Sequence, residues 1–243
     1  MTNSNTLRCS RCGRPAADAD KFCAECGLFL RDAAIDPRLL LALAHEREGR
    51  GQEARKELER LLALEPNHAL ANHLLGTHLF HEGLLDQAAD CYRKAVAAAP
   101  NFILAHYDLG IACYYRGKMP CAISAFRRCL DIDRHYNAAH YRLALALFHS
   151  GQLDEAHEHF ELSRSLTPEY VMAHYHLGVI HERRGEYDEA AREFERGQEE
   201  SNDDVSGLYH LALIRDAQGD HAAAKELRQR ARGFSKSPGV AAK

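Results

Sequence analysis

Residues 103–136 read ILAHYDLGIACYYRGKMPCAISAFRRCLDIDRHY, and this stretch shows the pattern on which most of the chain is built. It holds two segments of helical length, 104–115 and 119–132, on either side of Gly117. Glycine readily adopts the left-handed backbone conformation that often ends a helix. The stretch therefore predicts two helices joined by a tight turn at Gly117.

The same pattern recurs every 34 residues. The glycines in this register are Gly49, Gly83, Gly117, Gly151, Gly185 and Gly219. The alanines are Ala54, Ala88, Ala122, Ala156, Ala190 and Ala224, and the leucines are Leu41, Leu75, Leu109, Leu143, Leu177 and Leu211. The chain has only 16 glycines in 243 residues, so six in one register indicate an internal repeat. Six units tile residues 35–238.

Each unit also alternates small and bulky positions. A small residue directly follows each register leucine: Ala42, Gly76, Gly110, Ala144, Gly178 and Ala212. A bulky residue stands four positions after the register alanine in the first five units: Leu58, Tyr92, Phe126, Phe160 and Phe194. We expect the small residues to let the two helices of a unit approach closely. We expect the bulky residues to fill the space between one unit and the next. Arg228 takes the bulky position in the last unit, which fits a terminal cap without a following neighbour.

These residues resemble the tetratricopeptide repeat, whose pattern is W-x2-L-G-x2-Y, then A-x3-F, then P. The third unit reads His106-x2-Leu109-Gly110-x2-Cys113 and Ala122-x3-Phe126. The chain has no Trp, and three units carry His106, His140 and His174 at the first aromatic position, where we expect them to pack. The resemblance implies an all-α fold, a right-handed α-solenoid of six helix-turn-helix repeats. The repeats are 35–68, 69–102, 103–136, 137–170, 171–204 and 205–238.

Two Cys-x2-Cys pairs precede the repeats, Cys9 with Cys12 and Cys23 with Cys26. Four thiolates form a closed tetrahedral site, which leaves no open position for catalysis. A segment of this size cannot build a sufficient hydrophobic core without the metal. The spacing therefore predicts a small four-cysteine zinc ribbon over residues 1–30 with a structural Zn²⁺. Iron in a rubredoxin-like site is the main alternative, and a role without metal is the other.

The remaining boundaries follow from these modules. We expect residues 31–34 to form a linker too short for free movement of the ribbon, and residues 239–243 to form a disordered tail. Leu39, Leu40 and Leu43 make the first repeat helix unusually apolar. We expect the ribbon to pack on this helix as a cap.

The resemblance also implies a concave groove, lined by the first helices of successive units, that binds peptides or partner helices. By register the groove residues are Tyr107, Ile111, Tyr114, Tyr141, Leu145, Tyr175, Val179 and Tyr209. Tyrosine offers a large contact area and a hydrogen bond at low entropic cost. The alternative is that these tyrosines only pack helix against helix. The carboxylate clamp that holds chaperone tails is not expected, because only Arg142 matches its residue types.

The other four cysteines are expected to be unpaired. Without a secretory signal, cysteines outside the ribbon favour core positions over disulfides. Cys113 and Cys129 occupy small core positions, whereas we expect Cys91 and Cys121 to be more exposed.

Composition limits the class of function. The net charge is −4, from 31 Lys and Arg against 35 Asp and Glu, which disfavours a general nucleic-acid surface. The sequence has neither a membrane-spanning apolar run nor a signal-peptide core, so a cytoplasmic location is expected. It also lacks GxxxxGK[ST], HExxH and GxSxG. We therefore expect a non-enzymatic adaptor or scaffold. The alternative is a regulatory module whose ribbon contacts nucleic acid or a nucleoprotein complex.

Overall fold

A computed structural model describes residues 7–8, 15–16, 23, 36–166, 171–200 and 205–234. The chain divides into two compact units, Met1–Ser150 and Gly151–Lys243. None of the helices in the described residues has the length and apolar character required to cross a bilayer. The predicted tail, linker and most of the predicted ribbon lie outside the described residues.

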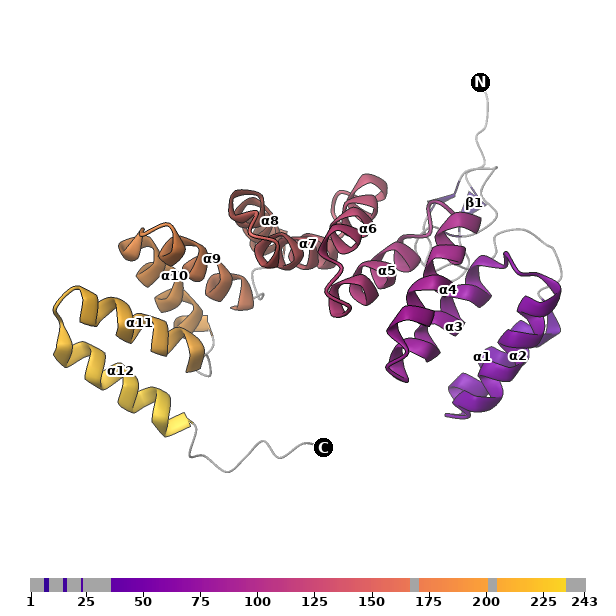
Figure 1. Ribbon diagram of the computed structural model, residues 1–243, viewed down its shortest axis with the longest axis horizontal. Helices are drawn as coiled ribbons and strands as arrows, with labels where there is room; N and C mark the ends of the chain where they lie inside the picture. The colour runs from indigo at the N-terminus through magenta and orange to yellow at the C-terminus, as the bar shows by residue number, and fades with distance from the viewer. Residues whose placement is uncertain are drawn as a thin grey trace, which may run out of the picture. The chain divides into compact units, whose positions relative to one another are not determined.

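Unit 1 holds a short hairpin and seven helices among its described residues. Strands β1 (Leu7–Arg8) and β2 (Pro15–Ala16) pair antiparallel, with Leu7 opposite Ala16 and Arg8 opposite Pro15. The helices are α1 (Pro37–Arg47), α2 (Gly51–Leu64), α3 (Ala69–His81), α4 (Leu85–Ala98), α5 (Ile103–Tyr115), α6 (Met119–Ile132) and α7 (Asn137–His149). Each helix contacts the next along the chain, and the order of the helices can be followed in Figure 1.

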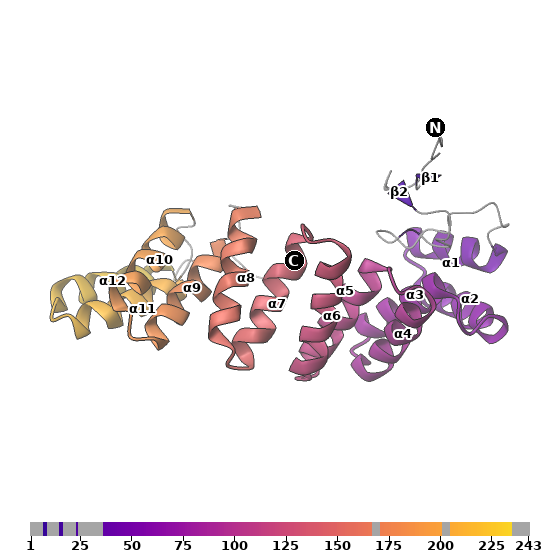
Figure 2. The same cartoon turned by 90° about the horizontal axis from the view of Figure 1, so that it is seen from above.

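Unit 2 continues the pattern with five described helices. These are α8 (Leu153–Leu166), α9 (Val171–Arg183), α10 (Tyr187–Glu200), α11 (Val205–Ala217) and α12 (His221–Phe234). Helices α9 and α10, and likewise α11 and α12, form contacting pairs, as both views show (Figure 1, Figure 2). The expectation of all-helical tetratricopeptide-type repeats is thus confirmed for the described residues. The expected helices at 104–115 and 119–132 match α5 and α6 to within one residue.

The turn within each repeat depends on glycine, as the spacing predicts. All six register glycines have positive φ, between 70° at Gly117 and 84° at Gly219. No other described residue type adopts this conformation. A side chain here would be strained, so the glycine fixes where each first helix ends.

The small and bulky positions meet inside each repeat. A Cβ atom added at Gly110 would lie 2.5 Å from the Phe126 ring, and one added at Gly178 would lie 2.7 Å from the Phe194 ring. Phe126 and Phe194 are fully buried. The bulky residues therefore do more than fill the space between units. They press against the small residue of their own repeat, and Phe194 also stacks on His210 of the next repeat at 5.1 Å.

The histidines in place of the first aromatic residue are buried and hydrogen-bonded. The Nε2 atoms of His106 and His140 lie 2.9 Å from the carbonyl oxygens of Pro100 and Arg134. A carbonyl oxygen can only accept, so in both histidines Nε2 carries the proton. His174 differs: its Nδ1 lies 2.7 Å from Glu193 Oε2, between α9 and α10 of one repeat.

Histidine–carboxylate contacts also join the first helices of successive repeats. His78 Nε2 lies 3.0 Å from Glu46 Oε1, which joins α3 to α1. His210 Nδ1 lies 2.7 Å from Glu182 Oε2, which joins α11 to α9. These contacts give several of the 16 histidines a packing role between repeats.

The first helix of the repeat array exposes leucines, and the last helix carries a polar residue at its bulky register position. The Asp36 side chain accepts from Arg38 N–H and caps α1, where Leu40 and Leu41 are half exposed. Most of the ribbon expected to cover this helix lies outside the described residues. At the other end, Arg228 on α12 forms an ion pair with Asp216 on α11, consistent with a polar terminal position.

The expectation that the remaining cysteines are unpaired is wrong for two of them. Cys113 in the last turns of α5 and Cys121 in the first turn of α6 form a disulfide, with a Cα–Cα distance of 5.8 Å. The turn at Gly117 brings these two helix ends together, which a separation of eight residues does not show by itself. Cys91, expected to be more exposed, is buried. Cys129 is buried as expected.

Candidate functional site

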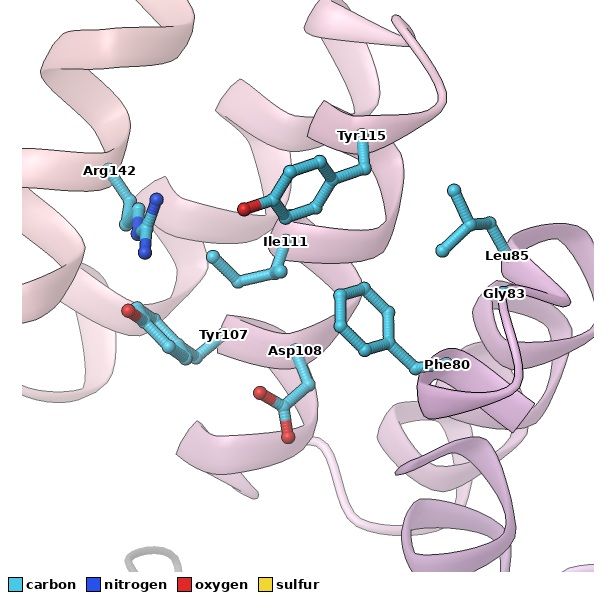
Figure 3. A pocket seen from close by; sticks show the side chains of 8 residues that line it. All are labelled: Phe80, Gly83, Leu85, Tyr107, Asp108, Ile111, Tyr115 and Arg142. Carbon is cyan, nitrogen blue, oxygen red and sulfur yellow. The ribbon is translucent and has the colours of Figure 1, made fainter. Parts of the chain in front are cut away.

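A hollow of about 530 Å³ lies in unit 1 beside the first helices α3, α5 and α7. The tight turn after α3 sets the start of α4 at one edge, and α5 runs along the middle (Figure 3). The residues that line it are Phe80, Gly83, Leu85, Tyr107, Asp108, Ile111, Tyr115 and Arg142. They come from three successive repeats, so the stacking of the repeats creates the hollow.

One side of the hollow is apolar. Phe80 and Tyr115 pack with ring centroids 5.9 Å apart, and Leu85 stands beside them at the start of α4 (Figure 3). Tyr115 is 58% exposed, so it offers surface to a ligand. Ile111 lies between this side and the side formed by Tyr107 and Arg142. An exposed apolar surface next to polar groups is typical of a binding site.

The Tyr107 ring is fixed by packing within its own repeat. It contacts Phe126 at 5.8 Å and Tyr136 at 5.6 Å between ring centroids. Its hydroxyl accepts a hydrogen bond from the Arg142 guanidinium on α7. Tyr107 therefore both holds the third repeat together and orients the arginine of the fourth.

Arg142 supplies a half-buried positive charge. Burial by itself lowers the pKa of Arg142, but the hydrogen bond with Tyr107 and the nearby Tyr115 and Tyr141 raise it above its usual value. The guanidinium is therefore charged at every accessible pH. Because it is partly removed from water, its attraction for an anion is stronger than that of an exposed arginine.

Asp108 supplies a negative charge on α5. Its Oδ2 lies 2.7 Å from His73 Nε2 on α3. The His73 ring is itself held against Phe102 at 4.9 Å. The carboxylate is thus positioned by the preceding repeat, and the hollow carries charges of both signs around an apolar centre.

The predicted groove residues fall into three groups. Tyr107 and Ile111 line the hollow. Tyr114, Tyr141 and Leu145 also belong to unit 1 but are not among its lining residues. Tyr114 packs against His149 at 5.7 Å, and burial raises its pKa. Tyr141 and Leu145 are buried. Tyr175, Val179 and Tyr209 belong to unit 2. Tyr209 is 41% exposed and Val179 is buried. The Tyr175 hydroxyl oxygen lies 3.5 Å from His210 Nε2.

Sequence reasoning missed several lining residues. Phe80 stands 34 residues before Tyr114, and Asp108 stands 34 residues before Arg142. The repeat register could have identified both, because they share positions with residues already considered. Tyr115 had no such signal, since nothing in the pattern shows that its ring turns toward the hollow.

Only Cys23 of the four predicted metal ligands is among the described residues. Cys9, Cys12 and Cys26 lie outside them. Cys23 is buried, and Arg8 of β1 pairs with Pro15 of β2. Strand β1 ends at Arg8, directly before the first cysteine in the sequence, and a donor set of four thiolates would suit Zn²⁺.

Comparisons with known proteins agree with this fold. The family model described as tetratricopeptide repeat matches residues 39–101, 107–168 and 141–205. No curated protein resembles the sequence closely enough to count as a match.

Solved structures with the same fold include two of MamA. One has 25% sequence identity and a TM-score of 0.64, and covers 70% of this chain and 92% of that one. The other, from Desulfovibrio magneticus RS-1, has 18% identity and a TM-score of 0.67, and covers 71% and 97%. YrrB, described as a TPR protein with an unusual peptide-binding site, has 17% identity and a TM-score of 0.63, and covers 74% and 93%. With the family model matching well over half of its length, the chain belongs to the tetratricopeptide-repeat family.

Proposed function

We propose that this protein is a non-enzymatic adaptor that binds a peptide or helix of a partner protein in the hollow of unit 1. The observation that carries the proposal is a hollow of about 530 Å³ with an apolar centre and charges of both signs. This volume lies within the range of ligand sites in proteins, about 300–1,000 Å³. Stacked helical repeats commonly use such surfaces for protein recognition.

The lining residues support a peptide better than a small polar molecule. Phe80, Leu85 and Tyr115 offer broad apolar contact on an open surface. Aromatic residues and arginine are the types that contribute most to binding at protein interfaces. The peptide-binding site named for YrrB gives a precedent on the same fold.

A pull-down from a nuclease-treated lysate, read by mass spectrometry, tests this proposal. The variant Tyr115→Ala with Ile111→Asn alters the hollow without touching Tyr107, whose ring packs on Phe126. Tyr187→Ala is the matched control, because Tyr187 is also exposed, at 48%, but lies on α10 in unit 2. Circular dichroism checks that every variant folds.

The expected result is one or more proteins retained by the native chain and by Tyr187→Ala but lost from the hollow variant. Equal retention by all three proteins would mean that partners bind elsewhere, and the hollow proposal would be wrong.

We also propose that Cys9, Cys12, Cys23 and Cys26 hold a structural Zn²⁺. The paired strands on either side of the first two cysteines and the burial of Cys23 support this. The metal would hold together a segment too small for its own core.

Elemental analysis of the purified chain should find one zinc per molecule, reduced in Cys12→Ser and unchanged in the control Cys91→Ser. Chelation should leave the helical circular dichroism almost unchanged, because the helices pack on one another. Finding iron in place of zinc, or no metal, would contradict the assignment.

A further inference from the structure

Several arginines of unit 1 form ion pairs with described carboxylates, and Arg142 does not. Arg116 pairs with Asp86, Arg128 with Asp131, and Arg55 with both Glu59 and Glu82. Within the part of the chain that the structure describes, Arg142 forms no ion pair with a carboxylate. It lies instead among tyrosines, with its guanidinium bonded to Tyr107. The hollow therefore contains a half-buried cation that forms no direct ion pair with a described carboxylate.

The apolar residues stand next to this cation. Figure 3 shows Arg142 on the α7 side, Phe80 and Leu85 on the α3–α4 side, and Ile111 between them. A ligand that places a carboxylate on Arg142 would thus lay its neighbouring side chain over Ile111, toward Phe80. A charge-assisted hydrogen bond to a partly desolvated guanidinium is among the stronger polar contacts.

Asp108 restricts the ligand further. Its carboxylate is held by His73 on one oxygen and lies at the lower edge of the hollow in the view of Figure 3. A second acidic group there would be repelled. The site thus fits one carboxylate in one place, rather than an evenly acidic segment.

We propose that the hollow selects a partner segment in which one acidic side chain stands beside a large apolar side chain. The carboxylate binds Arg142, and the apolar group packs on Ile111, Phe80 and Leu85. This inference rests on the proposed function, because it gives the chemistry of the peptide that the hollow would bind.

A phage-displayed library of random linear peptides, selected on the full chain, is the first test. The expected peptides combine one Asp or Glu with a nearby Phe, Leu, Ile or Met. Selection in parallel on Arg142→Gln should keep the apolar preference and lose the acidic one. Arg128→Gln is the matched control, since it removes the same charge from an exposed arginine that does not line the hollow.

A double-mutant cycle then measures the contact itself. The strongest selected peptide and its Glu→Gln (or Asp→Asn) version are titrated against the native chain and Arg142→Gln, with fluorescence polarisation as the readout. Each single change should weaken binding by about tenfold, and the two together should weaken it little further, as coupled charges do. The substitution in the peptide leaves the protein unchanged, so it measures the contribution of the acidic side chain to binding even if Arg142→Gln disturbs folding.

The outcomes separate the two proposals. If the neutral peptide binds the native chain as tightly as the acidic one, while Tyr115→Ala with Ile111→Asn abolishes binding, the acidic preference is wrong and the hollow remains a peptide site. If no peptide is selected, or if selected peptides bind that hollow variant unchanged, the proposed function fails, and the inference fails with it.

Discussion

Replacing Gly110 with alanine would test the tight contact between α5 and α6. The added Cβ atom would lie 2.5 Å, 2.7 Å and 2.8 Å from the Cε1, Cδ1 and Cζ atoms of Phe126. Phe126 is fully buried, so its ring has no solvent into which it could move. Overpacking of a core costs about 1–3 kcal/mol, whereas alanine in place of glycine inside a helix gains about 1 kcal/mol. The difference is a net loss of about 0–2 kcal/mol, and because the closest contact is as short as 2.5 Å we expect Gly110→Ala to lower the free energy of unfolding by an amount toward the upper end of this range.

Urea denaturation followed by far-UV circular dichroism measures this difference, since the chain has no tryptophan for fluorescence. Gly51→Ala is the matched control, because Gly51 is also a helical glycine of unit 1 and its added Cβ would meet only His78, at 3.7 Å. We expect this control to be unchanged or slightly more stable. Adding Phe126→Leu to Gly110→Ala recreates the Ala42 and Leu58 combination of the first repeat and should recover part of the loss. If Gly110→Ala were as stable as Gly51→Ala, the close-contact reasoning would be refuted.

Three other outcomes are expected. Cys121→Ser should lower the free energy of unfolding by about 2.5 kcal/mol, the value expected for a disulfide that closes so short a loop. A reductant should cause the same loss in the native chain and none in the variant, and an equal response of both would contradict this. Burial raises the pKa of Glu193, but the hydrogen bond with His174 and the charges of Arg164 and Arg196 hold it below its ordinary 4.5. The ionised Glu193 side chain therefore stabilises the fold fully when the pH is above the pKa of this residue in the unfolded chain. This stabilisation is lost as the pH falls through its lower pKa in the folded protein. On acidification, the melting temperature of Glu193→Gln should therefore drop less than that of the native chain. Burial raises the pKa of Cys129 to about 12, so iodoacetamide should label it only in the unfolded chain, as mass spectrometry can show.

The repeat register predicted the fold well because each register position answers a local physical need. Gly117 must allow a positive φ, and Gly110 must leave room for the Phe126 ring, and both needs can be read from residue type and spacing. The register also placed the histidines in the core. It did not predict that His106 bonds a backbone carbonyl whereas His174 bonds Glu193, because the choice depends on which acceptor each ring meets.

The site was predicted less completely. Register gives the direction of a side chain from its helix but not how far its neighbours cover it, so Tyr107 lines the hollow while the equivalent Tyr141 is buried. The pairing of Cys113 with Cys121 depends on how the two helix ends meet across the turn. Spacing alone does not contain that information.

The two kinds of histidine bond have different consequences for exchange of repeats between proteins. The Nε2 atoms of His106 and His140 bond main-chain oxygens of the segment before them, so any preceding repeat with the same backbone could supply these acceptors. His174 needs the carboxylate of Glu193 on the second helix of its own repeat. In a recombined array, α5 or α7 could follow many different repeats, whereas α9 would have to be transplanted together with α10.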